Sequence, residues 1–374
     1  MFSLRSSAVL LLLFFVTLLS GILHGETDKD RQREQIDDLV RQLAHDKYAK
    51  REAARKQLVV IGEKALPAIR EAKVTRGLDF ETLAKQVTRS ILIRSSKSKA
   101  IGLELAVVDE GKFDMGSPRG ERNRHPDETL HSVRISRPFL VGKYEVTQDE
   151  YTRVMKHNPS WTSSTGEGKN KVAGVNTTQF PVENVTWYDA IEFCNRLSKL
   201  DGFAPYYLVA EAKIEKDSIK SASVMALGGN GYRLPTEAEW EFCCRAWTSG
   251  PYHFGNENSG TDANTRPGPA YGYGGGPNWT ALGRTAKVGN YKPNHLGLFD
   301  MHGNVAEWCW DYFDKDYYST SPEVDPIGPE KGYLRLLRGG SWMVSEGSCR
   351  SATRFHMAPE TSKEYIGFRV ARSP

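Results

Sequence analysis

Glycine and tryptophan are concentrated in one part of this chain, and this constrains its fold more than any other feature. Residues 101–374 contain thirty of the 34 glycines, all eight tryptophans and fifteen of the 16 tyrosines. Residues 26–100 contain two glycines, one tyrosine and no tryptophan, with 18 Lys and Arg against 12 Asp and Glu. Glycine suits turns, and aromatic residues favour strands. We therefore expect a helical segment over 26–98, a polar junction over 95–99 and a loop-rich domain over 101–374.

The first 25 residues are typical of a secretory signal. A run of ten mostly apolar residues, Leu10–Leu19, follows Arg5, and charged residues begin after Gly25. This run is about half the roughly twenty apolar residues that a membrane-spanning helix requires. We expect cleavage after residue 25 and a secreted, periplasmic or cell-envelope location. The alternative is an uncleaved N-terminal anchor, which would be the chain's only contact with a membrane.

Residues 26–98 show the periodicity of amphipathic helices. Apolar residues recur at helical spacing from Ile36 to Leu43 and again from Phe80 to Ile91. The stretch Leu39–Ala72 resembles a single HEAT-like repeat. One such repeat cannot bury both of its faces, so the segment is either a spacer or a docking element for another protein.

Two helices and several short strands are expected in residues 101–374. A helix over 186–197 begins at a threonine cap, and a second begins at Thr236, which forms a capping box with Glu239. Glu237 and Glu239 then lie in the first turn of this helix, where the helix dipole stabilises acidic side chains. We therefore expect these two residues to have a structural role and not a catalytic one. The strand candidates are Leu105–Asp109, His131–Ile135, Phe139–Val146 and Gly367–Ala371.

Seven stretches in this order resemble the sulfatase-modifying-factor family, whose founding activity is the formylglycine-generating enzyme. They are FDMGS (113–117), PDETLHSVRISRPFLVGKYEVTQDEY (126–151), FPVENVTWYDAIEFCNRLS (180–198), GYRLPTEAEWEFCCRA (231–246), HLGLFDMHGNVAEWCWD (295–311), LLRGGSWM (336–343) and IGFRVAR (366–372). The resemblance implies an α+β, C-type-lectin-like fold with little regular secondary structure.

The resemblance also implies a chemistry whose key residues are incomplete here. The family's enzyme oxidises a cysteine in an unfolded sulfatase segment to formylglycine, using O2 and a copper ion held by two cysteines. The first of these positions is Val344. Two thiolates are needed for a two-coordinate soft-metal site, and Cys349 better matches a downstream structural cysteine. Copper is therefore not expected, and the catalytic candidates that remain are Cys349 and Ser341.

Calcium is the metal that the resemblance favours. It implies a site with two side-chain ligands and two backbone carbonyls, provided by Asp300, Gly303, Val305 and Glu307. Oxygen ligands of this kind suit Ca²⁺. The alternative is that Asp300 and Glu307 are only turn and capping residues. A second, weaker calcium site would use Asn264 and the Thr265 carbonyl, but its acidic ligand falls near Thr280.

Five cysteines in an exported chain permit disulfides and leave at least one free thiol. The family resemblance implies a Cys244–Cys349 disulfide. The same comparison leaves Cys194, Cys243 and Cys309 reduced.

The residues leave three functions open. A net charge of +4 without a basic stripe argues against nucleic-acid binding, and His125 and His131 lack a third ligand for a metal. The function that we expect is a binding module for a peptide, a glycan or a protein such as an exported sulfatase, with calcium as a structural ion. The alternatives are a formylglycine-generating oxidase and an enzyme of different chemistry on the same fold.

Overall fold

The computed structural model describes residues 28–75, 78–258, 260–267 and 280–374. The chain divides into two compact units, with the boundary after Ser95. The predicted signal at 1–25 lies outside the described residues. Within the described ranges, no helix combines the length and the apolar character needed to cross a membrane.

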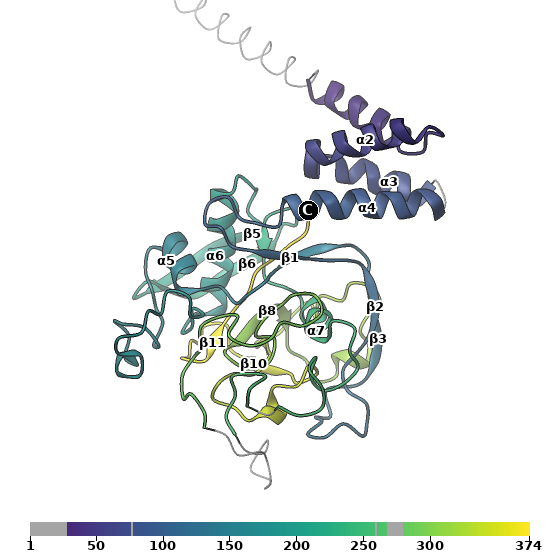
Figure 1. The fold of residues 1–374 in the computed structure, drawn as a ribbon. Helices are drawn as coiled ribbons and strands as arrows, with labels where there is room; N and C mark the ends of the chain where they lie inside the picture. The colour runs from purple at the N-terminus through teal and green to yellow at the C-terminus, as the bar shows by residue number, and fades with distance from the viewer. Residues whose placement is uncertain (1–27, 76–77, 259, 268–279) are drawn as a thin grey trace, which may run out of the picture. The chain divides into compact units, whose positions relative to one another are not determined.

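The first unit is helical, as its periodicity predicts (Figure 1). Residues 28–42 form a helix, followed by α2 (Tyr48–Ile61), the 3₁₀ turn η1 (Gly62–Ala65), α3 (Leu66–Thr75) and α4 (Leu78–Arg94). The buried side chains include Leu43, Leu58, Ile69, Val87 and Ile91. Gly62 ends α2 with a φ of 77°, a conformation that glycine adopts without strain. The likeness to a HEAT repeat stays a prediction.

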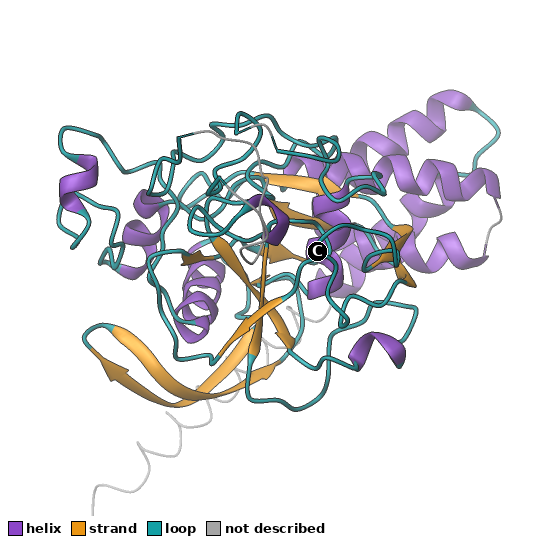
Figure 2. Cartoon of the chain, turned by 90° about the horizontal axis from the view of Figure 1, so that it is seen from below, coloured by secondary structure: helices purple, strands orange, loops and turns teal. Residues whose placement is uncertain are grey.

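The second unit consists largely of loops, short strands and short helices, in contrast to the helical first unit (Figure 2). Its strands are β1 (Leu105–Val108), β2 (Gly111–Met115), β3 (His131–Ile135), β4 (Phe139–Gly142), β5 (Tyr207–Glu215), β6 (Ser218–Ala226), β7 (Tyr232–Arg233), β8 (Ala306–Tyr312), β9 (Arg335–Arg338), β10 (Phe355–Met357), β11 (Ile366–Gly367) and β12 (Ala371–Arg372).

These strands form two four-stranded sheets, in the orders β1-β4-β12-β7 and β10-β9-β8-β11, and two hairpins, β2-β3 and β5-β6. In the first sheet β12 pairs with β4, so the end of the chain closes against residues more than two hundred positions earlier. A buried cluster that includes Val133, Phe139, Trp240 and Leu336 forms the core. The loops that carry the candidate site lie directly before β8 and directly after β9.

Three α-helices of this unit begin at threonine caps. They are α5 (Gln148–Met155), α6 (Trp187–Leu200) and α7 (Glu237–Arg245), each with a complete capping box. The two helices expected from the sequence are confirmed as α6 and α7, while α5 was not predicted. The expected strands at 105–109 and 131–135 are confirmed within a residue. The strand expected over 139–146 ends at Gly142, and the one over 367–371 is split between β11 and β12.

The described part of this unit also contains short 3₁₀ turns. They are η2 (Lys169–Val172), η4 (Tyr317–Ser319) and η5 (Glu346–Ser348). The last of these lies directly before Cys349 and sets the position of that residue in the site described next.

Candidate functional site

Three segments that are distant in sequence meet at the turn before β8. The backbone NH of Asn304 donates to the Asn264 carbonyl at 2.9 Å, and Gly303 NH donates to Gly339 O at 2.8 Å. Gly303 has a φ of 82°, and a Cβ there would lie 2.3 Å from Asn264 O, so this position requires glycine. The predicted residues 264, 303 and 341–349 therefore belong to one neighbourhood.

The two catalytic candidates lie in this neighbourhood, below the surface. Cys349 is fully buried and Ser341 is 1% exposed. A Cβ on Gly340 would lie 2.4 Å from Cys349 Sγ, so the glycine pair before Ser341 leaves room for the thiol. Burial raises the pKa of Cys349 to about 12, so this thiol is protonated near neutral pH.

The predicted Cys244–Cys349 disulfide is wrong, because all five cysteines are free and buried. Cys244 Sγ lies 3.6 Å from both His302 Nε2 and Ser351 Oγ. Cys349 Sγ is 3.7 Å from Ser345 O. The two sulfur atoms thus have different partners, and a buried imidazole and a hydroxyl face the first of them. Cys194, Cys243 and Cys309 are also free and buried.

His302 is a buried residue of this neighbourhood that sequence reasoning missed. Its Nδ1 donates to the Cys349 carbonyl at 2.8 Å, and its Nε2 accepts from the backbone NH of His253 at 3.2 Å. This pattern assigns the neutral ring with the proton on Nδ1. Burial lowers the pKa of His302 well below its usual value, in agreement with that assignment. His302 therefore fixes the backbone that carries Cys349.

The predicted calcium residues surround a buried group of carboxylates. Asp300 Oδ2 accepts from Gly289 NH at 2.7 Å, whereas its Oδ1 is buried without a hydrogen-bond partner among the described residues. Glu307 pairs with Arg369 through two contacts of 2.6 Å. Glu145, which sequence reasoning missed, accepts from Val305 NH at 3.1 Å. Arg369 is thus the guanidinium held directly against a group with three carboxyl side chains.

This surplus of negative charge affects protonation. Burial, together with the charges of Asp300 and Glu307, raises the pKa of Glu145 well above its usual value. Burial likewise raises the pKa of Asp300 to about 6. The side chains alone do not form a metal site, since among the described residues no three His, Cys, Asp or Glu converge to hold an ion. A calcium ion would therefore need the backbone carbonyls of the turn as well.

The free Asp300 oxygen and the excess of carboxyl groups fit a divalent cation. The residues that would hold it are Asp300 and Glu307, through their side chains, and Gly303 and Val305, through backbone carbonyls. The weaker second site stays a prediction, because the Asn264 amide nitrogen donates to Arg284 O and Asn304 Oδ1, both at 3.1 Å, and these contacts do not involve the side-chain oxygen that would bind a cation. Thr265 Oγ1 accepts from Asn258 Nδ2 at 2.9 Å. Both residues serve here to join loops.

Comparison with known proteins gives a consistent result. The family described as sulfatase-modifying factor enzyme 1-like domain matches residues 94–374. A Paenibacillus barcinonensis protein named chaperone protein LppX is 33% identical over 267 residues, which cover 67% of this chain and 82% of that protein. A formylglycine-generating enzyme of Streptomyces coelicolor is 40% identical over 280 residues, 70% of this chain and 86% of the enzyme. The solved structure of Treponema denticola variable protein 1 superposes with a TM-score of 0.62 at 30% identity, covering 74% of this chain and 98% of that one.

Proposed function

The chain belongs to the sulfatase-modifying factor enzyme 1-like family, and we propose that it is an exported member that binds a peptide segment of another protein without oxidising it. Its second unit has the α+β, C-type-lectin-like fold of that family. An exported sulfatase is the partner class that family membership suggests. Export itself is proposed from the apolar run at residues 10–19.

The state of Cys349 is the observation that carries the proposal. A copper ion bound between two cysteines needs two thiolates on accessible sulfur atoms. Here Val344 occupies the first position, and Cys349 is buried with a pKa raised by burial to about 12. The other four cysteines are also completely buried. These features oppose thiol-pair chemistry at the site.

The names of the relatives support a binding role. Chaperone protein LppX matches over most of its length, and chaperones as a class act by binding other proteins. Within this domain, loops held by buried contacts can present side chains to a partner while the backbone stays fixed. Calcium would add to this by joining the side chains of Asp300 and Glu307 to backbone carbonyls of the same turn, which is a structural contribution.

The second candidate function is the oxidase itself. It is favoured by the 40% identity to the Streptomyces coelicolor enzyme. Under that alternative Cys349 would have to become accessible and be joined by a second thiolate. Cys244 is the cysteine whose charge acts on the pKa of Cys349, and its own pKa is raised by burial to about 12.

A peptide-binding experiment distinguishes the two functions. A labelled, unstructured peptide that contains the CxPxR motif and a copy with serine for cysteine are titrated with the full chain by fluorescence anisotropy. We expect equal affinities for the two peptides and no change in their mass. Failure to bind either peptide contradicts the proposal. A complex that only the cysteine peptide forms with the chain, and that a reductant breaks, also contradicts the proposal.

A further inference from the structure

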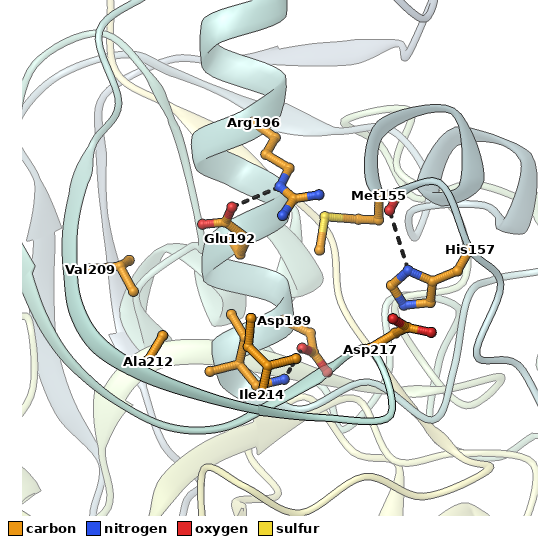
Figure 3. A pocket seen from close by; sticks show the side chains of 10 residues that line it. Met155, His157, Asp189, Glu192, Arg196, Val209, Ala212, Ile214 and Asp217 are labelled. Atoms are coloured by element: carbon orange, nitrogen blue, oxygen red, sulfur yellow. Dashed lines mark hydrogen bonds and ion pairs between the residues drawn. The ribbon is translucent and has the colours of Figure 1, made fainter.

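A pocket of about 320 Å³ lies between the β5–β6 hairpin, α6 and the end of α5. Figure 3 shows that Val209, Ala212 and Ile214 reach it from the hairpin, whereas Glu192 and Arg196 come from the helix. The pocket is built from residues other than those around Cys349. A ligand there would be additional to the proposed function.

Five of the residues that line the pocket are apolar. Met155, Val209, Ala212, Ile214 and Ile219 provide aliphatic and thioether surface. Ile214 is 64% exposed, so part of this apolar surface faces solvent. The hairpin that carries it has register irregularities between Ala210 and Ile214, which interrupt the regular pairing of the strands. An elongated hydrocarbon group could pack against these apolar side chains.

Three other residues that line the pocket are acidic. Glu192 pairs with Arg196 at 2.7 Å, whereas Asp189 and Asp217 form no ion pair among the described residues. Asp189 is fixed by Ser218 Oγ at 2.7 Å and Ile219 NH at 2.8 Å, so its carboxylate also anchors the hairpin to α6. Three carboxylates against one guanidinium leave an excess of two negative charges among the acidic and basic side chains of the lining.

A buried tyrosine that packs against His157, a lining residue, has a hydroxyl without a hydrogen-bond partner among the described residues. This residue is Tyr151, which is fully buried. Burial raises the pKa of this hydroxyl well above its usual value, and the charges of Asp189 and Glu192, which line the pocket, add to the rise. Its ring also packs edge-on against the His157 ring, with centroids 5.6 Å apart. A buried polar atom without a partner is costly unless a ligand or water completes it.

We propose that this pocket binds the side chain of a lysine or arginine from a partner protein. The hydrocarbon stem of such a side chain would contact the apolar residues of the pocket. Its cationic head would pair with the carboxylates of Asp189, Glu192 and Asp217. An anionic side chain would be repelled by the carboxylates. A purely apolar side chain would leave them desolvated without a counter-charge. His157 donates through Nδ1 to Met155 O at 3.3 Å, which leaves its other nitrogen able to accept.

The test uses short acetylated peptides without cysteine, each with one central lysine, arginine, norleucine or acetyl-lysine. They are titrated into the isotope-labelled full chain, and backbone NMR shifts are followed. We expect the lysine or arginine peptide to shift the amides of Met155 and Ile219. Norleucine and acetyl-lysine should not do so. Because these peptides lack cysteine and the pocket lacks Cys349, the result is independent of the peptide test of the proposed function.

Two substitutions locate the binding. Glu192→Gln with Asp217→Asn should weaken the lysine peptide about tenfold or more, because two charge-assisted contacts are lost. Glu215→Gln is the matched control, since it removes one charge from an exposed position of the same hairpin and should change affinity less than about twofold. Asp217→Asn alone lies at an exposed turn and keeps the test usable if the double variant unfolds.

Three results would overturn the proposal. They are equal binding of acetyl-lysine, an unchanged affinity in the Asp217→Asn and double variants, and shifts that avoid the pocket amides. A free aliphatic diamine that binds as tightly as the peptide would also contradict it, because the ligand would then not be a protein side chain.

Discussion

The helical unit and the second unit place their charged side chains in opposite ways. In the described part of the first unit no charged side chain is buried, and the Arg55–Glu52 pair leaves 33% and 26% of its side chains exposed. In the second unit the Arg338–Glu241 pair is completely buried. Arg350 and Arg369 are likewise buried against carboxylates.

The difference is also one of distance along the chain. Arg55 and Glu52 are three residues apart, whereas Arg338 and Glu241 are 97 apart and Arg350 and Glu128 are 222 apart. A helical unit stabilises itself by local periodicity. A loop-rich domain has few regular hydrogen-bond ladders, so buried arginines that donate to several loops hold it together.

Removing a buried charge should give the largest effect. Glu241→Gln weakens contacts to Arg338 and Arg245 and leaves two buried guanidinium groups without full compensation. We expect a loss of about 3–5 kcal/mol in unfolding free energy. Tryptophan fluorescence during urea unfolding reports this unit alone, since all eight tryptophans lie in residues 101–374. Glu52→Gln is the surface control, and far-UV circular dichroism should show the first unit almost unchanged. Comparable losses of stability in the two variants would contradict the distinction.

The first unit should instead be sensitive to its apolar stripe. Leu58 is fully buried in α2. Leu58→Ala should destabilise this unit by about 3 kcal/mol through lost burial and the cavity left behind. Far-UV circular dichroism should show an earlier helix transition, with tryptophan fluorescence unchanged. A shift of the fluorescence transition would show that the two units do not unfold independently.

Calcium should act on the second unit only. At about 100 times its dissociation constant, a ligand stabilises the folded state by about 2.7 kcal/mol. We expect a chelator to lower the fluorescence-detected melting temperature and to leave the helical transition in place. Asp300→Asn should abolish the response, and it is cleaner than a change at Glu307, which also pairs with Arg369. If the chelator does not change the melting temperature of the unaltered chain, Asp300 is only a turn residue and the calcium prediction is wrong.

Acid should weaken the second unit by a smaller amount through His253. Burial lowers the pKa of His253 to about 4, below its usual value of about 6.5. The unfolded chain therefore binds the proton more readily, so this stability is present above about pH 6.5 and is lost as the pH falls towards 4. Allowing for partial solvent access, we expect a loss of about 2 kcal/mol. In chelator, His253→Asn should show a shallower decline than the unaltered chain; parallel curves would refute the assignment.

The same contrast explains what the sequence could predict. The helices at 187–200 and 237–245 followed from threonine caps and apolar spacing, which are local signals. The β5–β6 hairpin was missed because β5 is almost entirely exposed and lacks the alternation of a half-buried strand. His302 and Glu145 were missed because their partners, Cys349 and Val305, are supplied by distant segments. The disulfide prediction used family positions and could not anticipate the imidazole beside Cys244.

The most direct test of the claim that this chain does not oxidise its partner is the fate of a sulfatase cysteine. The full chain is co-produced with an exported sulfatase in a host without formylglycine-generating activity, and the sulfatase active-site peptide is examined by mass spectrometry. We predict that the cysteine stays unmodified with and without added copper. Conversion to the aldehyde, abolished by Cys349→Ser, would contradict the account and establish the chain as an oxidase.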